Sequence, residues 1–187
     1  ILIEPIGNIY YAINSKPFVI GANILTTCTD YSFPFPITVD GGVHESFITV
    51  PFTINGTVSE ISINLNLTHQ ELSLLRIIIE SPNGSLVTIF GNNCPNTGGV
   101  FNLNISDSGT VINCNSTANQ NILSLEPMSL FFGENPQGIW KIKAYNLYND
   151  NTVGLINNAT FHICTQELNS LSSNNFSSDK DLKVISG

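Results

Sequence analysis

The chain has 187 residues, of which 42% are hydrophobic and only 11% are charged. Its formal net charge is −8, and its six Lys and Arg residues do not cluster. A nucleic acid or an anionic membrane surface needs a basic face, so the composition argues against both partners. Because no apolar run reaches the roughly 18 residues of a membrane-spanning helix, we expect no membrane insertion.

The chain begins with ILIEPIGNIYYAIN, which lacks the basic segment that opens a signal peptide. This start is typical of the cut edge of a larger chain. We therefore assign residues 1–27 to an N-terminal extension or to the edge of a preceding domain. Short strands are predicted next, around Ile37–Val39 and over Phe47–Phe52.

The clearest strand is EISINLNL, residues 60–67, in which apolar and polar side chains alternate strictly. Such a period of two places the apolar side chains on one face, as in a half-buried strand. The stretch LLRIIIESPNGSLVTIF contains two apolar runs separated by Ser81-Pro82-Asn83-Gly84, which predicts a hairpin. Pro82 presets φ for the turn, and Gly84 accepts a positive φ.

The same alternation occurs in VFNLNIS (100–106), GIWKIKAYN (138–146) and ATFHIC (159–164). Residues 115–130 lack it, and we predict a long crossing loop there with one helical turn. Many short strands separated by Gly, Pro and Asn turns predict an all-β fold, a single-domain, jelly-roll-like antiparallel β-sandwich over residues 28–164. The polar tail, residues 165–187, is typical of a linker.

The cysteines contain no Cys-x-x-Cys pair, which argues against a zinc ribbon or a thioredoxin-like site. Their even number and wide spacing favour disulfides in an oxidising compartment, hence a secreted or cell-surface protein, with four free buried thiols as the alternative. Of the three pairings that four cysteines allow, we favour Cys94 with Cys114, which would close a loop rich in Asn and Gly. Cys28 with Cys164 would then tie the first strand to the last.

The sequence predicts no catalytic residue. His44, His69 and His162 belong to no zinc or nucleophile motif, and the scattered carboxylates form no recognisable glycosidase pair. Calcium is the one cofactor with candidate ligands, because it binds oxygen atoms from loops. The alternative is that the same residues are turn formers with local hydrogen bonds. The candidate calcium ligands are Asp40, Asp107, Glu134, Asn135 and Asp150.

Two blocks of the sequence match a known family pattern in order. The matching residues of the first block are Leu67-Thr68-His69, Leu75 and Ser81-Pro82-Asn83-Gly84-Ser85. Those of the second are Phe132-Gly133-Glu134, Gly138, Trp140 and Gly154-Leu155-Ile156-Asn157. Together these segments resemble the P domain (P/Homo B domain) of proprotein convertases, over roughly residues 28 to 164.

Several acidic positions of the family are missing here, which weakens any calcium site carried over from it. The positions concerned hold Leu74, Ser106-Asp107 and Asn146. The cysteine arrangement looks like that of P domains in secreted proteins of the Bacteroidota. The tail NNFSSDKDLKV is similar to the linker that leads into a type IX secretion sorting domain in those bacteria.

The resemblance implies a non-catalytic accessory, stabilising or interaction module of a larger secreted or cell-surface protein, as P domains support the protease they follow. Its partners would be the adjacent domains of the same chain. The alternative hypothesis is a carbohydrate- or surface-binding adhesion module with a protein or glycan ligand. Such sites usually need aromatic platforms, and the available aromatic side chains are Phe33, Phe35, Tyr145 and Tyr148.

Overall fold

The computed structural model describes residues 23–148 and 151–169. The elements in chain order are β1 (Asn23–Ser32), β2 (Ile37–Val39), β3 (His44–Val50), β4 (Thr57–His69), η1 (Leu72–Leu74), β5 (Leu75–Glu80), β6 (Leu86–Gly91), β7 (Gly99–Ser106), β8 (Gln120–Leu123), η2 (Met128–Phe131), β9 (Gly138–Asn146) and β10 (Gly154–Asn169). The elements η1 and η2 are single 3-10 turns. No helix among the described residues is long and apolar enough to cross a bilayer.

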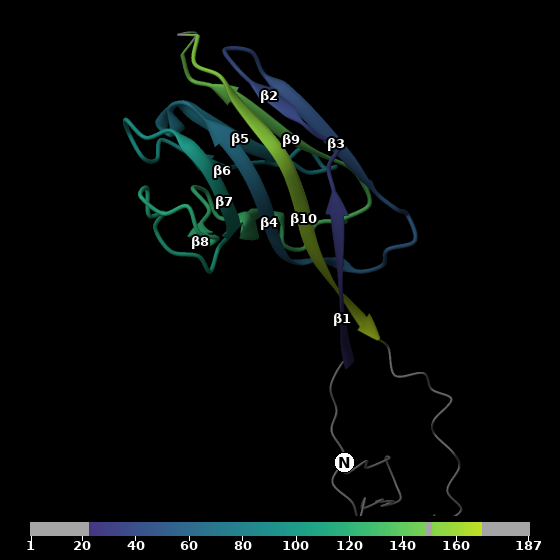
Figure 1. The fold of residues 1–187 in the computed structure, drawn as a ribbon. Helices are drawn as coiled ribbons and strands as arrows, with labels where there is room; N and C mark the ends of the chain where they lie inside the picture. The colour runs from purple at the N-terminus through teal and green to yellow at the C-terminus, as the bar shows by residue number, and fades with distance from the viewer. Residues whose placement is uncertain (1–22, 149–150, 170–187) are drawn as a thin grey trace, which may run out of the picture. The chain divides into compact units, whose positions relative to one another are not determined.

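The strands form two sheets, which Figure 1 shows as layers. Sheet A has the order β1-β10-β4-β7-β8, with β2 also paired to β10. Sheet B has the order β3-β9-β5-β6. All pairs with a described register are antiparallel except β7 with β8. The predicted all-β, antiparallel sandwich is confirmed.

The core lies between the two sheets and follows from the alternation in the sequence. In β4 the apolar side chains of residues 61, 63, 65 and 67 are buried, whereas the polar ones between them are exposed or half-buried. Trp140 of β9 has no exposed surface and packs against Phe131 and Phe161, each with ring centroids 5.1 Å apart. Because Phe161 belongs to β10, this aromatic contact joins sheet B to sheet A. Each such fully buried side chain contributes about 1.5–3 kcal/mol to folding.

The predicted hairpin is present as β5 and β6, which pair antiparallel across the turn at Ser81–Gly84. Residues 115–130 are more ordered than the predicted crossing loop, since they contain β8 as well as η2. Strand β8 has a single buried side chain, Ile122, which is too little alternation to mark a strand. It pairs in parallel with β7.

Both favoured disulfides are present, Cys28–Cys164 and Cys94–Cys114, and no cysteine is free. The compact unit of the sandwich spans Leu25–Glu167. The predicted boundaries at residues 28 and 164 therefore fall inside β1 and β10. Residues 1–22 of the predicted extension and 170–187 of the predicted linker lie outside the described residues.

Candidate functional site

His69, at the end of β4, is buried and connects the two sheets. Its Nε2 lies 2.8 Å from Oδ1 of Asn146 on β9, and its Nδ1 accepts a hydrogen bond of 3.2 Å from the Glu71 amide. Asn146 donates through Nδ2 to the carbonyl oxygen of Thr152 at 2.7 Å. Because Oδ1 of Asn146 can only accept, Nε2 of His69 is the donor in this hydrogen bond. This histidine therefore joins the two sheets through its hydrogen bonds.

Gly154 lies opposite His69 in the register of β10 with β4. A Cβ atom at this position would lie 2.0 Å from Cδ2 of the His69 ring. Only glycine permits so close an approach between a backbone and a side chain. The two family positions are thus explained together, as a ring and the glycine on which it packs.

The turn that leads into β9 holds the family residues Gly133, Glu134 and Gly138. The glycines have φ of +83° and +118°, values that favour glycine. Oε1 of Glu134 accepts a hydrogen bond of 2.5 Å from the Ser85 hydroxyl, which ties this turn to the β5–β6 turn. The indole Nε1 of Trp140 donates to the Pro136 carbonyl at 2.8 Å. These two hydrogen bonds hold the segment in place within the fold.

The β5–β6 turn, which holds the remaining family residues of the first block, is closed by its own hydrogen bonds. The Ser81 amide donates to the Ser85 carbonyl at 2.9 Å. The Ser81 hydroxyl is buried and accepts from the Ser85 amide at 3.2 Å. The Gly84 amide donates to the Ser81 carbonyl at 2.9 Å. Pro82 faces the other turn, since a Cβ on Gly138 would lie 2.9 Å from its Cβ.

The candidate calcium ligands have local partners. Asp107 accepts hydrogen bonds from the Met128 and Ser129 amides at 2.7 and 2.8 Å, so it caps the start of η2. Asn135 accepts from the Gln137 amide at 3.0 Å. Asp40 bonds His44 at 2.7 Å, and this contact with the imidazole holds its pKa below the ordinary value. Asp150 lies outside the described residues.

No set of three His, Cys, Asp or Glu side chains that includes a calcium candidate comes together within the described ranges. The set that does come together is Cys28, His162 and Cys164, whose sulfur atoms already form a disulfide. The structure therefore gathers no acidic site from these candidates, and calcium binding stays a prediction.

The outer face of sheet B carries a charge network. Lys141 and Lys143 of β9 bind Glu80 of β5 at 3.0 and 2.6 Å, and Lys143 also binds Glu45 of β3 at 3.3 Å. The two lysines hold the pKa of Glu80 below its ordinary value, and hydrogen bonding to Glu80 raises the pKa of Lys143. Beside the network, Phe47 is 60% exposed.

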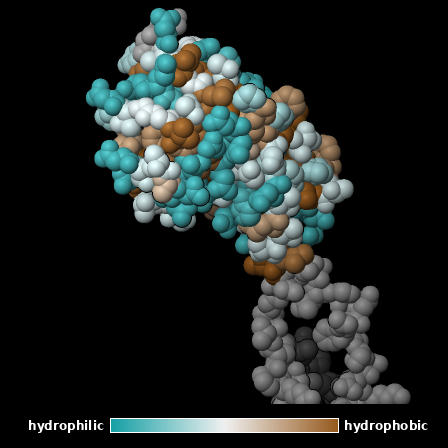
Figure 2. All heavy atoms as spheres, in the orientation of Figure 1, coloured by the Kyte–Doolittle hydropathy of each residue, from teal (hydrophilic) through white to brown (hydrophobic). Residues whose placement is uncertain are grey.

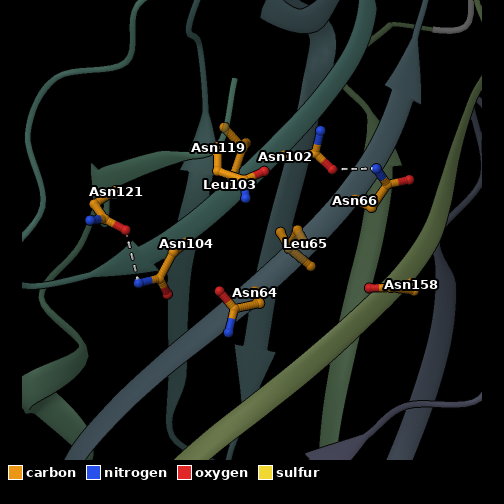
Figure 3. A pocket seen from close by; sticks show the side chains of 9 residues that line it. All are labelled: Asn64, Leu65, Asn66, Asn102, Leu103, Asn104, Asn119, Asn121 and Asn158. Atoms are coloured by element: carbon orange, nitrogen blue, oxygen red, sulfur yellow. Dashed lines mark hydrogen bonds between the residues drawn. The ribbon is translucent and has the colours of Figure 1, made fainter. Parts of the chain in front are cut away.

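The outer face of sheet A carries uncharged amides. A groove of about 300 Å³ lies over β4, β7, β8 and β10, and Figure 3 shows the side chains that line it. Apart from the buried Leu65 and Leu103, every residue that lines it is an asparagine. We call it the asparagine groove; its amide residues are Asn64, Asn66, Asn102, Asn104, Asn119, Asn121 and Asn158.

The aromatic side chains considered for a glycan platform do not gather on one surface. Phe33 is buried, and its ring contacts Phe35 and Phe161 with centroids 6.4 and 6.0 Å apart. Tyr148 is 66% exposed, whereas Tyr145 is half-buried opposite Arg76. On the face in view in Figure 2, hydrophilic residues form a continuous band between scattered hydrophobic ones.

Residues 58–163 match the family model of the proprotein convertase P-domain. This chain belongs to that family. The match runs from β4 to β10, so it includes the His69 contact, both turns and the two amide-bearing central strands of sheet A. No curated protein sequence matches the chain.

Among solved structures, this P domain is similar to the Aeromonas sobria serine protease in the crystal structure of its complex with the chaperone ORF2. The sequence identity is 15% and the TM-score 0.51, over 78% of this chain and 27% of that chain. A second crystal structure of the Aeromonas sobria serine protease has a TM-score of 0.49 at 15% identity, over 81% of this chain and 28% of that one. At this identity the likeness concerns the fold alone, and the P domain spans about a quarter of the protease chain.

Sequence reasoning located the family residues of this P domain but missed both outer faces. The charge network and the asparagine groove each join side chains from three or more strands. The polar faces of single strands were visible in the alternation, for example at Asn64 and Asn66. The sequence did not show which strands are neighbours in a sheet. That order decides which polar side chains share one surface.

Proposed function

We propose that the chain is a non-catalytic accessory module of a larger secreted protein, and that a neighbouring domain of that protein is a protease. The observation that carries this proposal is the P-domain match over residues 58–163. A P domain is an accessory domain, and the family residues form turns and packing contacts instead of a reaction centre. The two disulfides support secretion, because such bonds persist in oxidising compartments.

The outer face of sheet B is the surface we assign to the neighbouring domain. It combines the charge network of Glu45, Glu80, Lys141 and Lys143 with exposed apolar side chains, of which Phe47 is 60% and Ile139 is 50% exposed. Interfaces within one chain are typically of this mixed kind, more polar than permanent dimer contacts. Export by type IX secretion in a bacterium of the Bacteroidota belongs to the same proposal and is supported by the tail composition.

The experiment is to sequence the coding region around this segment and to produce the whole protein with and without residues 23–169. We expect a protease domain in the same chain, with a lower melting temperature when the module is removed. In the whole protein, Ile139→Ser should lower the melting temperature of the neighbouring domain, because it removes an apolar side chain from the proposed contact surface. Leu123→Ser, at a side chain of 50% exposure on β8 of sheet A, is the matched control.

Absence of an enzyme domain from the parent chain would contradict the protease part of the proposal. An unchanged melting temperature of the neighbour after removal of the module would contradict the stabilising role. Equal effects of the two serine variants would place the contact elsewhere than on sheet B.

A further inference from the structure

We propose that the asparagine groove on the outer face of sheet A binds a neutral carbohydrate chain. This role is separate from the accessory role of the module and does not depend on it. The grounds are the arrangement of the amides, the groups they leave free and the lack of charge in the groove.

The amides form two rows across neighbouring strands. In the first row Asn158 of β10, Asn66 of β4 and Asn102 of β7 stand opposite one another. In the second row Asn64 of β4, Asn104 of β7 and Asn121 of β8 stand opposite one another, with Thr160 of β10 beside Asn64. Neighbouring strands are about 4.8 Å apart, so each row presents several hydrogen-bonding side chains within the length of a short sugar chain. The outward-facing grid is rigid because its backbone is paired on both sides at β4 and β7.

Part of the grid is organised by its own hydrogen bonds. Asn66 donates to Asn102 at 2.5 Å and accepts from Asn157 at 2.7 Å, while Asn104 donates to Asn121 at 3.1 Å. These bonds, two of which are drawn in Figure 3, fix the direction of the amides before any ligand arrives. Preorganised donors and acceptors lose less conformational entropy on binding than mobile ones.

Other members of the grid keep their hydrogen-bonding groups free. Among the described residues, neither Asn64 nor Asn158 makes a side-chain hydrogen bond with a protein group, and both are exposed. Each free amide offers two donors and an acceptor. A hydroxyl both donates and accepts, so a neutral ligand rich in hydroxyls can satisfy both ends of each amide.

The lack of charged residues in the groove disfavours charged ligands. No residue that lines it is charged, and the whole chain carries a net charge of −8. A phosphate backbone, an anionic lipid or an acidic polysaccharide would find no cation there and would be repelled by the rest of the molecule. A volume of about 300 Å³ lies at the small end of ligand sites, which fits a short stretch of a sugar chain better than a protein partner.

The groove has no aromatic platform, so we expect weak binding to each site, with a Kd on the order of 1 mM. The probes are therefore immobilised polysaccharides in affinity electrophoresis, which detects weak binding. The neutral set is a β-glucan, a xylan and a galactomannan, and the anionic set is alginate and heparin. Side-chain amide signals in NMR spectra, recorded with a soluble oligosaccharide of the retarding polysaccharide, locate the site.

The test variant is the double substitution Asn64→Ala with Asn158→Ala, which removes two exposed amides without internal bonds and so leaves the fold intact. The control is Asn83→Ala, an exposed asparagine in the β5–β6 turn on the other sheet. We expect retardation by at least one neutral polysaccharide, unchanged in 0.5 M NaCl, reduced at least tenfold in the double variant and retained in the control.

Four results would overturn the proposal. The first is no retardation by any neutral polysaccharide. The second is equal retardation of the double variant and the natural protein. The third is binding of anionic polysaccharides alone. The fourth is a concentration-dependent dimer that the double variant abolishes. Either of the last two would assign the groove to a different occupant.

Discussion

At the scale of single residues, the polar side chains that matter most here are those that join the two sheets. His69 is 2% exposed and Asn146 is 4% exposed, and a hydrogen bond joins their side chains. A buried polar group that loses its partner costs its full desolvation penalty. The pair therefore stabilises the sandwich only while both members are present.

We expect Asn146→Leu to lower the free energy of unfolding by about 2–3 kcal/mol, because Nε2–H of His69 and the Thr152 carbonyl each lose a hydrogen bond. Urea denaturation followed by tryptophan fluorescence measures this change, since Trp140 is buried in the core. Asn157→Ala, which removes an exposed amide, should change the stability by less than about 0.5 kcal/mol. Equal losses in the two variants would show that the contact between sheets carries no special weight.

Glu80 makes the stability depend on acid pH. Its folded-state pKa lies below its ordinary value of 4.5 because Lys143 and Lys141 hydrogen-bond the charged carboxylate. A lowered folded-state pKa contributes stability above the unfolded value, and that contribution is lost as the pH falls through the folded value. The Glu80 contribution should therefore be complete at pH 7 and absent in strong acid.

We expect Glu80→Gln to destabilise the protein by about 1 kcal/mol at pH 7 and to match the natural protein once the pH is well below 4.5. Melting temperatures between pH 2 and pH 8 measure this convergence. Glu60→Gln serves as the control, because Glu60 is exposed and forms no ion pair within the described ranges. A difference between Glu80→Gln and the natural protein that persists at pH 2 would contradict the assignment.

At the scale of elements, periodicity found the strands with many inward side chains and failed where there were few. Strands β4, β7 and β9 each alternate over at least three buried positions, and this alternation predicted all three, whereas β5 was predicted from its apolar run and the turn that follows it. Strand β8 contributes only Ile122 to the core and is held by its parallel pairing with β7. A short strand with one buried side chain shows no alternating pattern, so its own sequence does not identify it.

The two disulfides close loops of very different length, and their contributions should differ accordingly. Cys94 and Cys114 are 20 residues apart, whereas Cys28 and Cys164 are 136 apart. In the chain-entropy model, replacing the first pair by serine costs about 3 kcal/mol and replacing the second about 5 kcal/mol. Denaturant unfolding of the two double variants measures both values. A larger loss from the short loop would mean that local packing around Cys94 outweighs loop entropy.

At the scale of the whole molecule, the order of strands determines what each face offers. Sequence alternation showed that Asn64, Asn66, Asn102 and Asn104 point away from the core. Only the sheet order β10-β4-β7-β8 sets them side by side in one groove. The calcium candidates differ from the groove residues in this respect. Asp107 and Asn135 resemble ligands in the sequence, but in the fold their side chains accept hydrogen bonds from backbone amides. Tertiary pairing decides both outcomes, and a single sequence does not specify it.

The Cys28–Cys164 bond lies near both ends of the sandwich, and its cysteines are 136 positions apart in the sequence. A pulling force that enters the chain before residue 28 and leaves after residue 164 passes through one covalent bond. Strands β2 to β9 then bear none of that load, and stretching the ends does not peel them apart. In a larger protein under shear, the module would act as an inextensible link whose surfaces keep their shape under tension.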